Sequence, residues 1–454
     1  MTLYDAFGRE VDVSRLREEQ AAPTMSGVRN IYSSLHPSAG LTPERLTRIL
    51  REAEFGDPFL YLELAEEMEE KDLHYLAVLA TRKQTVSNLD LEVRPASSAK
   101  DDLRAAEMVR TMLAGDALDL PSAMLDILDA IGKGFSATEI VWDSSEREWF
   151  PRRLRWRDPR WFLFDWVSGD ELLVRNLGNE GPRAAVDSAA DGRGSHFQGN
   201  GLSAALRGGI QPMTEPLLPY KFIVHIAKSK AGLPIRGGLA RAAGWSYLFK
   251  NYVLKDWVTF AEVYGQPLRV GKYGAGATEQ DRERLLQAVA NIGTDAAAII
   301  PESMVIEFTE AHQVGSTELY QSCCQYLDAQ VSKAVLGQTL TTEVPQGAGS
   351  RAAAQVHDLV RHDILSADAR RLAATINRDL VKPIVDLNLG PRENYPHVVL
   401  GIADDSDASE FVDIIGKLAD HGVRIGQKAV LDRLGIAEPQ AGEPLLHPAR
   451  APLV

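Results

Sequence analysis

Two long helical segments on either side of a short mixed segment constrain the fold of this chain more than any other feature. Residues 238 to 265 carry aromatic side chains every three to five positions, which is the spacing of one face of an amphipathic helix. Residues 316 to 337 form the second helix, which begins at a serine cap and ends at Gly337. We interpret the aromatic residues as packing groups: Trp245, Phe249, Tyr252, Trp257, Phe260 and Tyr264.

The segment between these helices, residues 266 to 312, predicts a compact strand–helix–strand unit. "PLRVGKY" has the composition of a strand, and Thr278 is placed to cap the helix that follows. "AAIIPESMVIEFTEA" indicates the strand or strands that close the unit. The glycines of "GKYGAGATE" lack the G-x-G-x-x-G spacing, so we interpret them as a turn and not as a phosphate site.

A polar stretch, "GQTLTTEVPQGAGSR" at residues 337 to 351, separates the second helix from a third. From Ser350 the helical pattern runs to residue 388, interrupted by Pro383. If that helix continues to Lys382, it is about 50 Å long at 1.5 Å per residue. The polar stretch fits a linker between domains, a nucleotide-binding loop or a loop that contacts a moving polymer.

The N-terminal part of the chain predicts a mixture of helices and strands. Residues 1 to 40 have a turn-forming composition and little periodicity, which indicates an extended arm. Helices are expected after Thr42, with Pro43 at the first helical position, and after Asp57 and Pro58. The second of these helices has apolar residues along one face: Leu62, Ala65, Met68, Leu73, Leu76 and Leu79. "LDLEVRPA" and "SATEIVWD" alternate as strands do.

Two further segments complete the pattern, and the fold class that the whole chain predicts is α+β. Residues 178 to 212 are rich in Gly, Ala and Ser, which indicates a mobile surface loop or insertion. Residues 396 to 454 predict a small acidic module with a strand-like "HVVLGIA" and two short helices separated at Gly422.

The composition is that of a folded protein with an acidic balance. At 454 residues, with 45% hydrophobic and 25% charged residues, the chain can form two or three domains. A formal net charge of -14 argues against a surface that wraps DNA, but leaves open DNA that slides past without sticking. The adjacent Cys323 and Cys324 are poorly placed to bridge each other, which favours a reducing compartment. Without an apolar signal core or membrane-length run, we expect a soluble protein made inside the cell and no membrane partner.

Sequence motifs of catalysis are missing. The chain has no G-x-x-x-x-G-K-[ST] phosphate cradle and no G-x-S-x-G nucleophile elbow. His357 and His362 are five residues apart, about 140° around a helix, so they cannot share a ligand face as the histidines of H-E-x-x-H do. We therefore expect no enzyme, no cofactor and no metal. An intracellular enzyme with an unrecognised site, using His357 or His362, stays as one alternative.

The segment "EFVDIIGKLADHGVRIGQKAVLDRLG" supplies a second alternative, a helix-turn-helix reader of DNA. Such readers present clustered Arg and Lys to the major groove. The neighbourhood here is acidic instead, with Asp404, Asp405, Asp407, Glu410 and Asp413. An acidic regulatory protein is therefore the weaker hypothesis, although it stays open.

Four stretches carry a family resemblance: "LPYKFIVHIAKSKAGLPIRGGLARAAGWSYLFKNYVLKDWVTFAEVYGQPLRVGKY", "VLGQTLTTE", "GSRAAAQVHD" and "ADARRLAATINRDLVKPIVDLN". With the order of segments described above, they resemble the portal proteins of tailed bacteriophages, in particular those of Mu-type phages and prophages. The resemblance covers roughly residues 20 to 440 and is strongest from 219 to 390. The long matched span, and not a catalytic motif, makes it specific.

The resemblance implies an architecture for the α+β chain. It implies an N-terminal arm and mixed α/β wing, two stem helices, a small βαβ clip, a tunnel loop, a long wing helix and a helical crown. In order, these parts would occupy residues 1–235, 236–265 with 316–337, 266–315, 338–350, 351–395 and 396–454.

The resemblance also implies a function and partners. Portal proteins form a ring, typically twelve-fold, at one capsid vertex, through which double-stranded DNA is packaged and later ejected. The implied partners are further copies of this chain, the terminase large subunit, head–tail adaptor proteins, a capsid or scaffold protein, and DNA without sequence specificity. The implied location is the virion of a phage, prophage or gene transfer particle, after assembly in the bacterial host cytoplasm.

The resemblance places the polar stretch in the DNA channel. Its uncharged hydrogen-bonding side chains, its flexible Gly347 and Gly349, and its near-zero net charge suit a surface past which a polyanion slides. A plain connection between two helices is the alternative. The candidate channel residues are Gln338, Thr339, Thr341, Thr342, Glu343, Gln346 and Arg351. The candidate residues of the clip, for terminase and connector proteins, are Glu279, Asp281, Arg282, Glu283 and Arg284.

Overall fold

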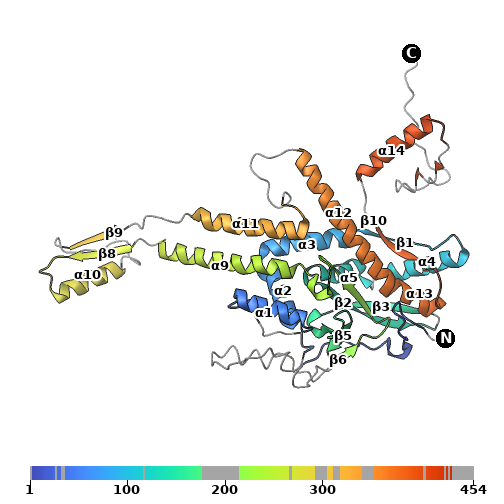
Figure 1. The fold of residues 1–454 in the computed structure, drawn as a ribbon, viewed down its shortest axis with the longest axis horizontal. Coiled ribbons are helices and arrows are strands. Elements are labelled where there is room, and N and C mark those ends of the chain that lie inside the picture. The colour runs from blue at the N-terminus through green and yellow to red at the C-terminus, as the bar shows by residue number, and fades with distance from the viewer. Residues whose placement is uncertain are drawn as a thin grey trace, which may run out of the picture. The chain divides into compact units, whose positions relative to one another are not determined.

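The computed structural model describes most of the chain in two compact units, residues 1–400 and 401–454 (Figure 1). The Gly-rich segment 178–212 lies outside the described residues. The described ranges are 3–25, 28–31, 36–115, 118–146, 148–175, 214–264, 268–291, 304–309, 317–339, 351–401, 405–423, 426–427 and 430–431.

Short helices form much of the N-terminal half of the first unit. α1 begins as predicted, because Thr42 accepts a hydrogen bond from the Arg45 N–H at 3.2 Å. Leu46, Tyr61 and Leu79, from three of these helices, are each at most 1% exposed, so the helices share one apolar core. Their bounds are α1 Pro43–Glu54, α2 Phe59–Lys71, α3 Leu73–Ser87, α4 Lys100–Leu113, α5 Leu120–Ile127 and α6 Ala130–Lys133.

The single helix expected after Asp57 is wrong, because the structure has two helices there, α2 and α3. Asp72 ends α2 with an extended backbone and caps α3. Its carboxylate accepts hydrogen bonds from the N–H groups of His74 at 3.0 Å and Tyr75 at 3.1 Å. The break changes the buried face, and Leu73 of the expected apolar stripe is 78% exposed.

The strands of this unit pair antiparallel in small sheets. β2 is central in the order β3-β2-β7, and a second sheet has the order β4-β5-β6. Phe135 of β2 meets Phe164 of β4 edge to face at 5.0 Å between ring centres, which joins the two sheets in the core. The bounds are β1 Asp90–Arg94, β2 Phe135–Ser144, β3 Trp149–Arg157, β4 Phe162–Phe164, β5 Leu172–Arg175, β6 Thr214–Pro216 and β7 Phe222–Ile226, with 3₁₀ turns at Val13–Arg15, Pro159–Trp161 and Pro234–Arg236.

The two long helices predicted from the sequence, α9 (Ala240–Tyr264) and α11 (Thr317–Leu336), pack side by side and antiparallel (Figure 1). Trp257 near the end of α9 stacks on Tyr320 near the start of α11, with ring centres 6.2 Å apart. Phe260 lies 5.7 Å from the same ring. The packing role predicted for the aromatic stripe is confirmed for these residues. Among the described residues, no helix combines the length and apolar character needed to cross a membrane.

The segment between α9 and α11 has the predicted order of a strand, a helix and a strand. β8 (Leu268–Tyr273) and β9 (Met304–Thr309) pair antiparallel, and Leu268 lies opposite Thr309 in the register. The helix α10 (Glu279–Asn291) connects them. The pairing is therefore local, unlike that of a parallel βαβ crossover.

The long helix predicted after Ser350 is present, but its interruption lies before Pro383. α12 (Arg351–Ile376) passes through a π-helical segment, Asn377–Val381, into α13 (Lys382–Leu389). A proline in a helix lacks an N–H and its ring crowds the carbonyl four residues earlier. The wider π turn is placed where it relieves that conflict.

The boundary expected at residue 396 differs from the structure. β10 (His397–Gly401) pairs with β1, so all of this strand except its last residue belongs to the first unit, and the second unit begins at Gly401. In the second unit, α14 (Asp405–Asp420) is followed by Gly422, whose φ of 79° ends the helix as predicted.

Candidate functional site

The structure describes the two ends of the predicted channel loop. α11 leads into Gln338 and Thr339, and Arg351 begins the backbone of α12. Thr341, Thr342, Glu343 and Gln346 lie outside the described residues, as does the side chain of Arg351. Gln338 is 3% exposed, so it belongs to the packed base of the loop.

Gly337 allows α11 to end in contact with α12. Its φ is +69°, and its N–H donates to the carbonyl of Lys333 at 3.1 Å. A Cβ at this position would lie 2.9 Å from Cγ1 of Val360 and 3.0 Å from Cδ1 of Ile364, both on α12. The base of the loop therefore depends on glycine both for its conformation and for the close approach of the two helices.

Arg82 on α3 joins the end of α11 to α12. Its Nη1 donates to the Val335 carbonyl at 2.7 Å, which satisfies one of the orphan carbonyls at the helix end. Its Nε and Nη2 bind the two carboxylate oxygens of Asp368 on α12, at 2.7 and 3.2 Å. We call Arg82, Val335, Gly337 and Asp368 the loop anchor. This cluster ties the end of α11, where the candidate loop begins, to α3 and, through Asp368, to the later part of α12.

A second set of polar contacts extends from the loop anchor along α11. The His74 ring nitrogen Nε2 lies 2.7 Å from Oγ of Ser332, a residue with 0% exposure. Lys250 on α9 bonds Asp72 at 3.0 Å and Asp328 at 2.6 Å. Burial alone would lower the pKa of Lys250, but its bonds to Asp328 and Asp72 raise it overall. The helices α3, α9 and α11 are thus held together by charged side chains near the loop.

The predicted residues of the clip are all on α10, and one of them is a capping residue. Oγ1 of Thr278 accepts from the Asp281 N–H at 3.3 Å, and the Asp281 carboxylate accepts from the Thr278 N–H at 3.1 Å. This reciprocal arrangement is a capping box. The hydrogen bonds from Thr278 lower the pKa of Asp281. Asp281 therefore serves the helix itself.

The other predicted residues lie on the exposed side of α10. The Arg282 guanidinium lies 5.0 Å from the ring centre of Tyr273 and 3.5 Å from the Glu279 carboxylate. Glu283 and Arg284 are exposed. Leu285, on the opposite side, is 4% exposed and packs toward Gly271 of β8. Leu286, which sequence reasoning did not select, is 69% exposed beside these charges.

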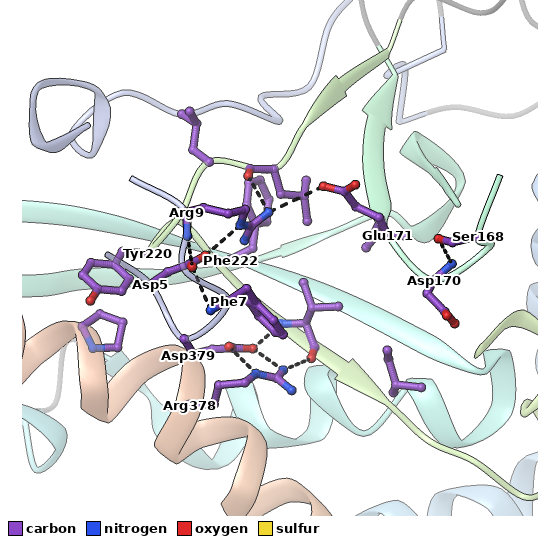
Figure 2. A pocket seen from close by; sticks show the side chains of 17 residues that line it. Asp5, Phe7, Arg9, Ser168, Asp170, Glu171, Tyr220, Phe222, Arg378 and Asp379 are labelled. Carbon is purple, nitrogen blue, oxygen red and sulfur yellow. Dashed lines mark hydrogen bonds and ion pairs between the residues drawn. The ribbon is translucent and has the colours of Figure 1, made fainter. Parts of the chain in front are cut away.

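A cavity of about 440 Å³ lies between the N-terminal arm, β7 and the π-helical segment (Figure 2). The Asp5 carboxylate accepts from the N–H groups of Phe7 and Arg9, each at 2.8 Å. The Phe7 ring lies 5.5 Å from each of two guanidiniums, those of Arg9 and Arg378. Arg378 is paired with Asp379 at 2.7 Å. Because these charged groups are paired within the chain, we assign the cavity no ligand. No local sequence pattern indicates this cavity, because its walls come from both ends of the first unit.

The alternative enzymatic residues do not form a site among the described residues. His357 and His362 are both on α12, and the side chain of His357 lies outside the described residues. In the part of the chain that the structure describes, no group of three or more His, Cys, Asp or Glu is placed to hold a metal ion. Cys323 and Cys324 are both free thiols on α11.

Comparison with known proteins shows the family to which this chain belongs. The model of a protein family described as the portal protein of Mu bacteriophage matches residues 62–436. The Mu-like prophage FluMu protein gp29 of Haemophilus influenzae (strain Rd) is 34% identical over 436 residues, covering 95% of this chain and 76% of the relative. The portal protein of Escherichia phage Mu is 34% identical over 412 residues, covering 90% and 73%. A chain from the neck of an empty gene transfer agent particle has the same fold at a TM-score of 0.51 and 10% identity, covering 82% of this chain and 92% of that chain.

Proposed function

Because this chain belongs to the portal protein family of Mu bacteriophage, as its sequence predicted, we propose that it forms a twelve-fold ring at one vertex of a phage-type capsid. In this position it is the head–tail connector, and double-stranded DNA passes through the ring during packaging and ejection. The family match over most of the chain is the observation that carries the proposal. The enzyme and the acidic regulatory protein are not favoured by it.

The distribution of exposed apolar side chains on the α9–α11 pair supports the ring. Leu254 and Val258 on α9 are 39% and 59% exposed, and Leu319 and Tyr326 on α11 are 60% and 64% exposed. Isolated apolar side chains are common on protein surfaces, but grouped ones indicate contact surfaces. We call Leu254 with Val258 the first flank, and Leu319 with Tyr326 the second flank.

The two flanks lie on opposite sides of the helix pair. A helix turns about 100° per residue, so the first flank is rotated in one sense from the residues of α9 that touch Tyr320. The second flank is rotated from Tyr320 in the opposite sense. Because the two helices are antiparallel, these opposite rotations bring the two flanks to opposite sides of the pair. A head-to-tail ring requires two different surfaces on each subunit, one for each neighbour. The two flanks meet that requirement.

The test uses one double variant for each flank. The first variant carries Leu254→Glu with Val258→Glu, and the second carries Leu319→Glu with Tyr326→Glu. Each should be a monomer by light scattering and negative-stain imaging. Mixed together, they should form dimers, because each variant keeps the flank that the other lacks. Lys255→Glu, on the exposed back of α9, is the matched control and should form rings. Rings in either flank variant, or a mixture that stays monomeric, would contradict the head-to-tail arrangement.

We place the loop at 338–350 in the channel of this ring. The support is the loop anchor, which holds the start of the loop at a packed junction of α3, α11 and α12. The uncharged side chains of Thr341, Thr342 and Gln346 offer hydrogen bonds without deep electrostatic wells for DNA.

The β8–α10–β9 unit is the proposed docking surface for the terminase large subunit and head–tail adaptor proteins. Its support is the exposed surface of α10, where Arg282, Glu283, Arg284 and Leu286 are accessible in one chain. We further propose association with a capsid or scaffold protein, a virion location, and assembly in the host cytoplasm.

Packaging energy then comes from the separate motor, so purified protein should not hydrolyse ATP. Steady hydrolysis that a point mutation abolishes would contradict this.

A further inference from the structure

Side chains of the π-helical segment and of α13 each hold a single residue on the outer edge of a strand, an arrangement that we call a clamp. Asn388 accepts from the Trp149 N–H and donates to the Trp149 carbonyl, both at 2.8 Å. Asn377 accepts from the Val398 N–H at 2.6 Å and donates to the Val398 carbonyl at 2.9 Å. In each clamp one side-chain amide satisfies both backbone groups of one strand residue, as a neighbouring strand would.

A third clamp of the same kind uses two neighbouring side chains. The Asp379 carboxylate accepts from the Val224 N–H at 3.0 Å, and Arg378 donates to the Val224 carbonyl at 2.8 Å. Arg378 and Asp379 are themselves paired at 2.7 Å, and Figure 2 shows this pair beside the cavity wall formed by β7. The ion pair therefore fixes the position of the donor, Arg378, relative to the acceptor, Asp379.

The clamped residues lie on strands that end a sheet. β3 and β7 are the outer strands of the β3-β2-β7 sheet, and β10 is one of the two strands of its own sheet. Outer strands present unpaired N–H and C=O groups, which are costly when buried and invite pairing with other chains. The three clamps close β3, β7 and β10 at one residue each and tie all of them to one helix.

The π-helical segment sets the phase of these clamps. Lys382 N–H donates to the carbonyl of Asn377, five residues earlier, as a π turn requires. Two of the clamps, those of Asn377 and of Arg378 with Asp379, start inside this segment, and the Asn388 clamp follows it. In an uninterrupted α-helix, Asn388 would be rotated differently relative to Asn377, Arg378 and Asp379. The three clamps could then not all reach their strands.

We propose that Asn377, Asp379 and Asn388 form a register lock, a set of positioning residues that fixes the axial and rotational position of α12. The helix α12 also carries Asp368 of the loop anchor, and Val360 and Ile364 against Gly337. A shift of the helix along its axis would therefore move the base of the 338–350 loop. The consequence for DNA passage rests on the proposed function, whereas the lock itself does not.

The experiment replaces the clamping amides by carboxylates of the same shape. Asn377→Asp and Asn388→Asp keep the acceptor but place negative charge beside backbone carbonyls; Asn388 faces two, those of Trp149 and Ile384. Asn394→Asp, at an exposed position just after α13, is the matched control. Hydrogen exchange by mass spectrometry in assembled rings reports on β3, β10 and α12 separately.

We expect each clamp variant to speed exchange about tenfold in α12 between residues 359 and 366, about three helical turns or more before the substitution. The control should leave exchange there unchanged. Faster exchange confined to the clamped strand, or equal effects in Asn394→Asp, would overturn the lock. If Asn388→Asp does not assemble, Asn388→Ala removes the clamp without added charge and carries the same expectation.

Measuring DNA packaging in the same variants separates the test of the register lock from the test of the channel assignment. Slower packaging together with faster α12 exchange supports both. Normal packaging in variants whose α12 exchange is raised refutes the placement of the 338–350 loop in the channel, while the lock stands. Slow packaging with unchanged α12 exchange overturns the lock.

Discussion

Replacing Arg82 by leucine tests whether the loop anchor holds the end of α11 to α12. The variant loses the bidentate bond to Asp368 and the bond to the Val335 carbonyl. It leaves the Asp368 carboxylate 4% exposed and with Arg371, at 3.5 Å, as its remaining cationic neighbour. A buried carboxylate without its main partner, and a helix-end carbonyl without a donor, should both destabilise the folded state.

The magnitude follows from the burial of the pair. Removing one partner of a buried ion pair costs about 3–5 kcal/mol. Arg82 is itself 16% exposed and Arg371 compensates in part, so we expect about 3 kcal/mol at most. In a unit of this size that corresponds to a fall of at most about 4 °C in melting temperature. Asp368→Leu combined with Arg82→Leu removes both charges, so the double variant should be more stable than the sum of single effects by about 2 kcal/mol.

The assay is thermal unfolding followed by circular dichroism, at one protein concentration because assembly shifts the midpoint. Arg370→Leu, an exposed arginine of α12 two residues after Asp368, is the control and should melt within about 1 °C of the parent protein. If Arg82→Leu behaves like the control, or if the two substitutions at Arg82 and Asp368 are additive, the pair does not hold the helices together. The loop would then need another account of how its base is fixed.

Three further outcomes are expected. Thr341→Lys with Thr342→Lys adds about two dozen positive charges in a twelve-fold ring, so DNA packaging or ejection should slow most at low salt with rings intact; normal rates would contradict the channel assignment. Reversing Arg282 and Arg284 to Glu should weaken binding to terminase and leave the ring intact, which a pull-down at low salt can disprove by unchanged capture. His225 has a pKa lowered to about 4 by burial, so the unfolded chain binds its proton more readily; stability from His225 is present above pH 6.5 and is lost as the pH falls toward 4. In His225→Gln the melting temperature should fall less steeply over that range, and an unchanged slope would show that other groups cause it.

Local signals in the sequence were sufficient for several elements. Thr42 and Thr278 were identified as caps because a hydroxyl precedes a helical pattern, and both cap helices in the structure. The aromatic spacing after residue 238 predicted α9, and Trp257 packs as expected. In each case the physical cause lies within a few residues along the chain. The family resemblance, which the comparisons confirm, added what such signals cannot supply, namely a function.

The features that sequence reasoning missed depend on partners far along the chain. Arg82 and Asp368 are 286 positions apart, so neither residue signals the other. Asp72 lies in an acidic helical run, and its role as a cap is supported by Lys250 from α9. The sequence predicts β10 as part of the C-terminal module because its partner, β1, is so distant along the chain. The polar composition around Gln338 predicts an exposed loop residue, yet packing at the end of α11 buries it.

The register of β8 and β9 brings the two ends of the β8–α10–β9 unit together. Leu268 and Thr309 are opposite each other on adjacent strands, so the chain enters and leaves the unit at points about 5 Å apart. The helices that carry the chain to and from these points, α9 and α11, already contact each other without it. The unit is therefore a cassette. Under the proposed function, its two closely spaced junctions would allow the docking surface to be exchanged for another while the pair of long helices keeps its packing.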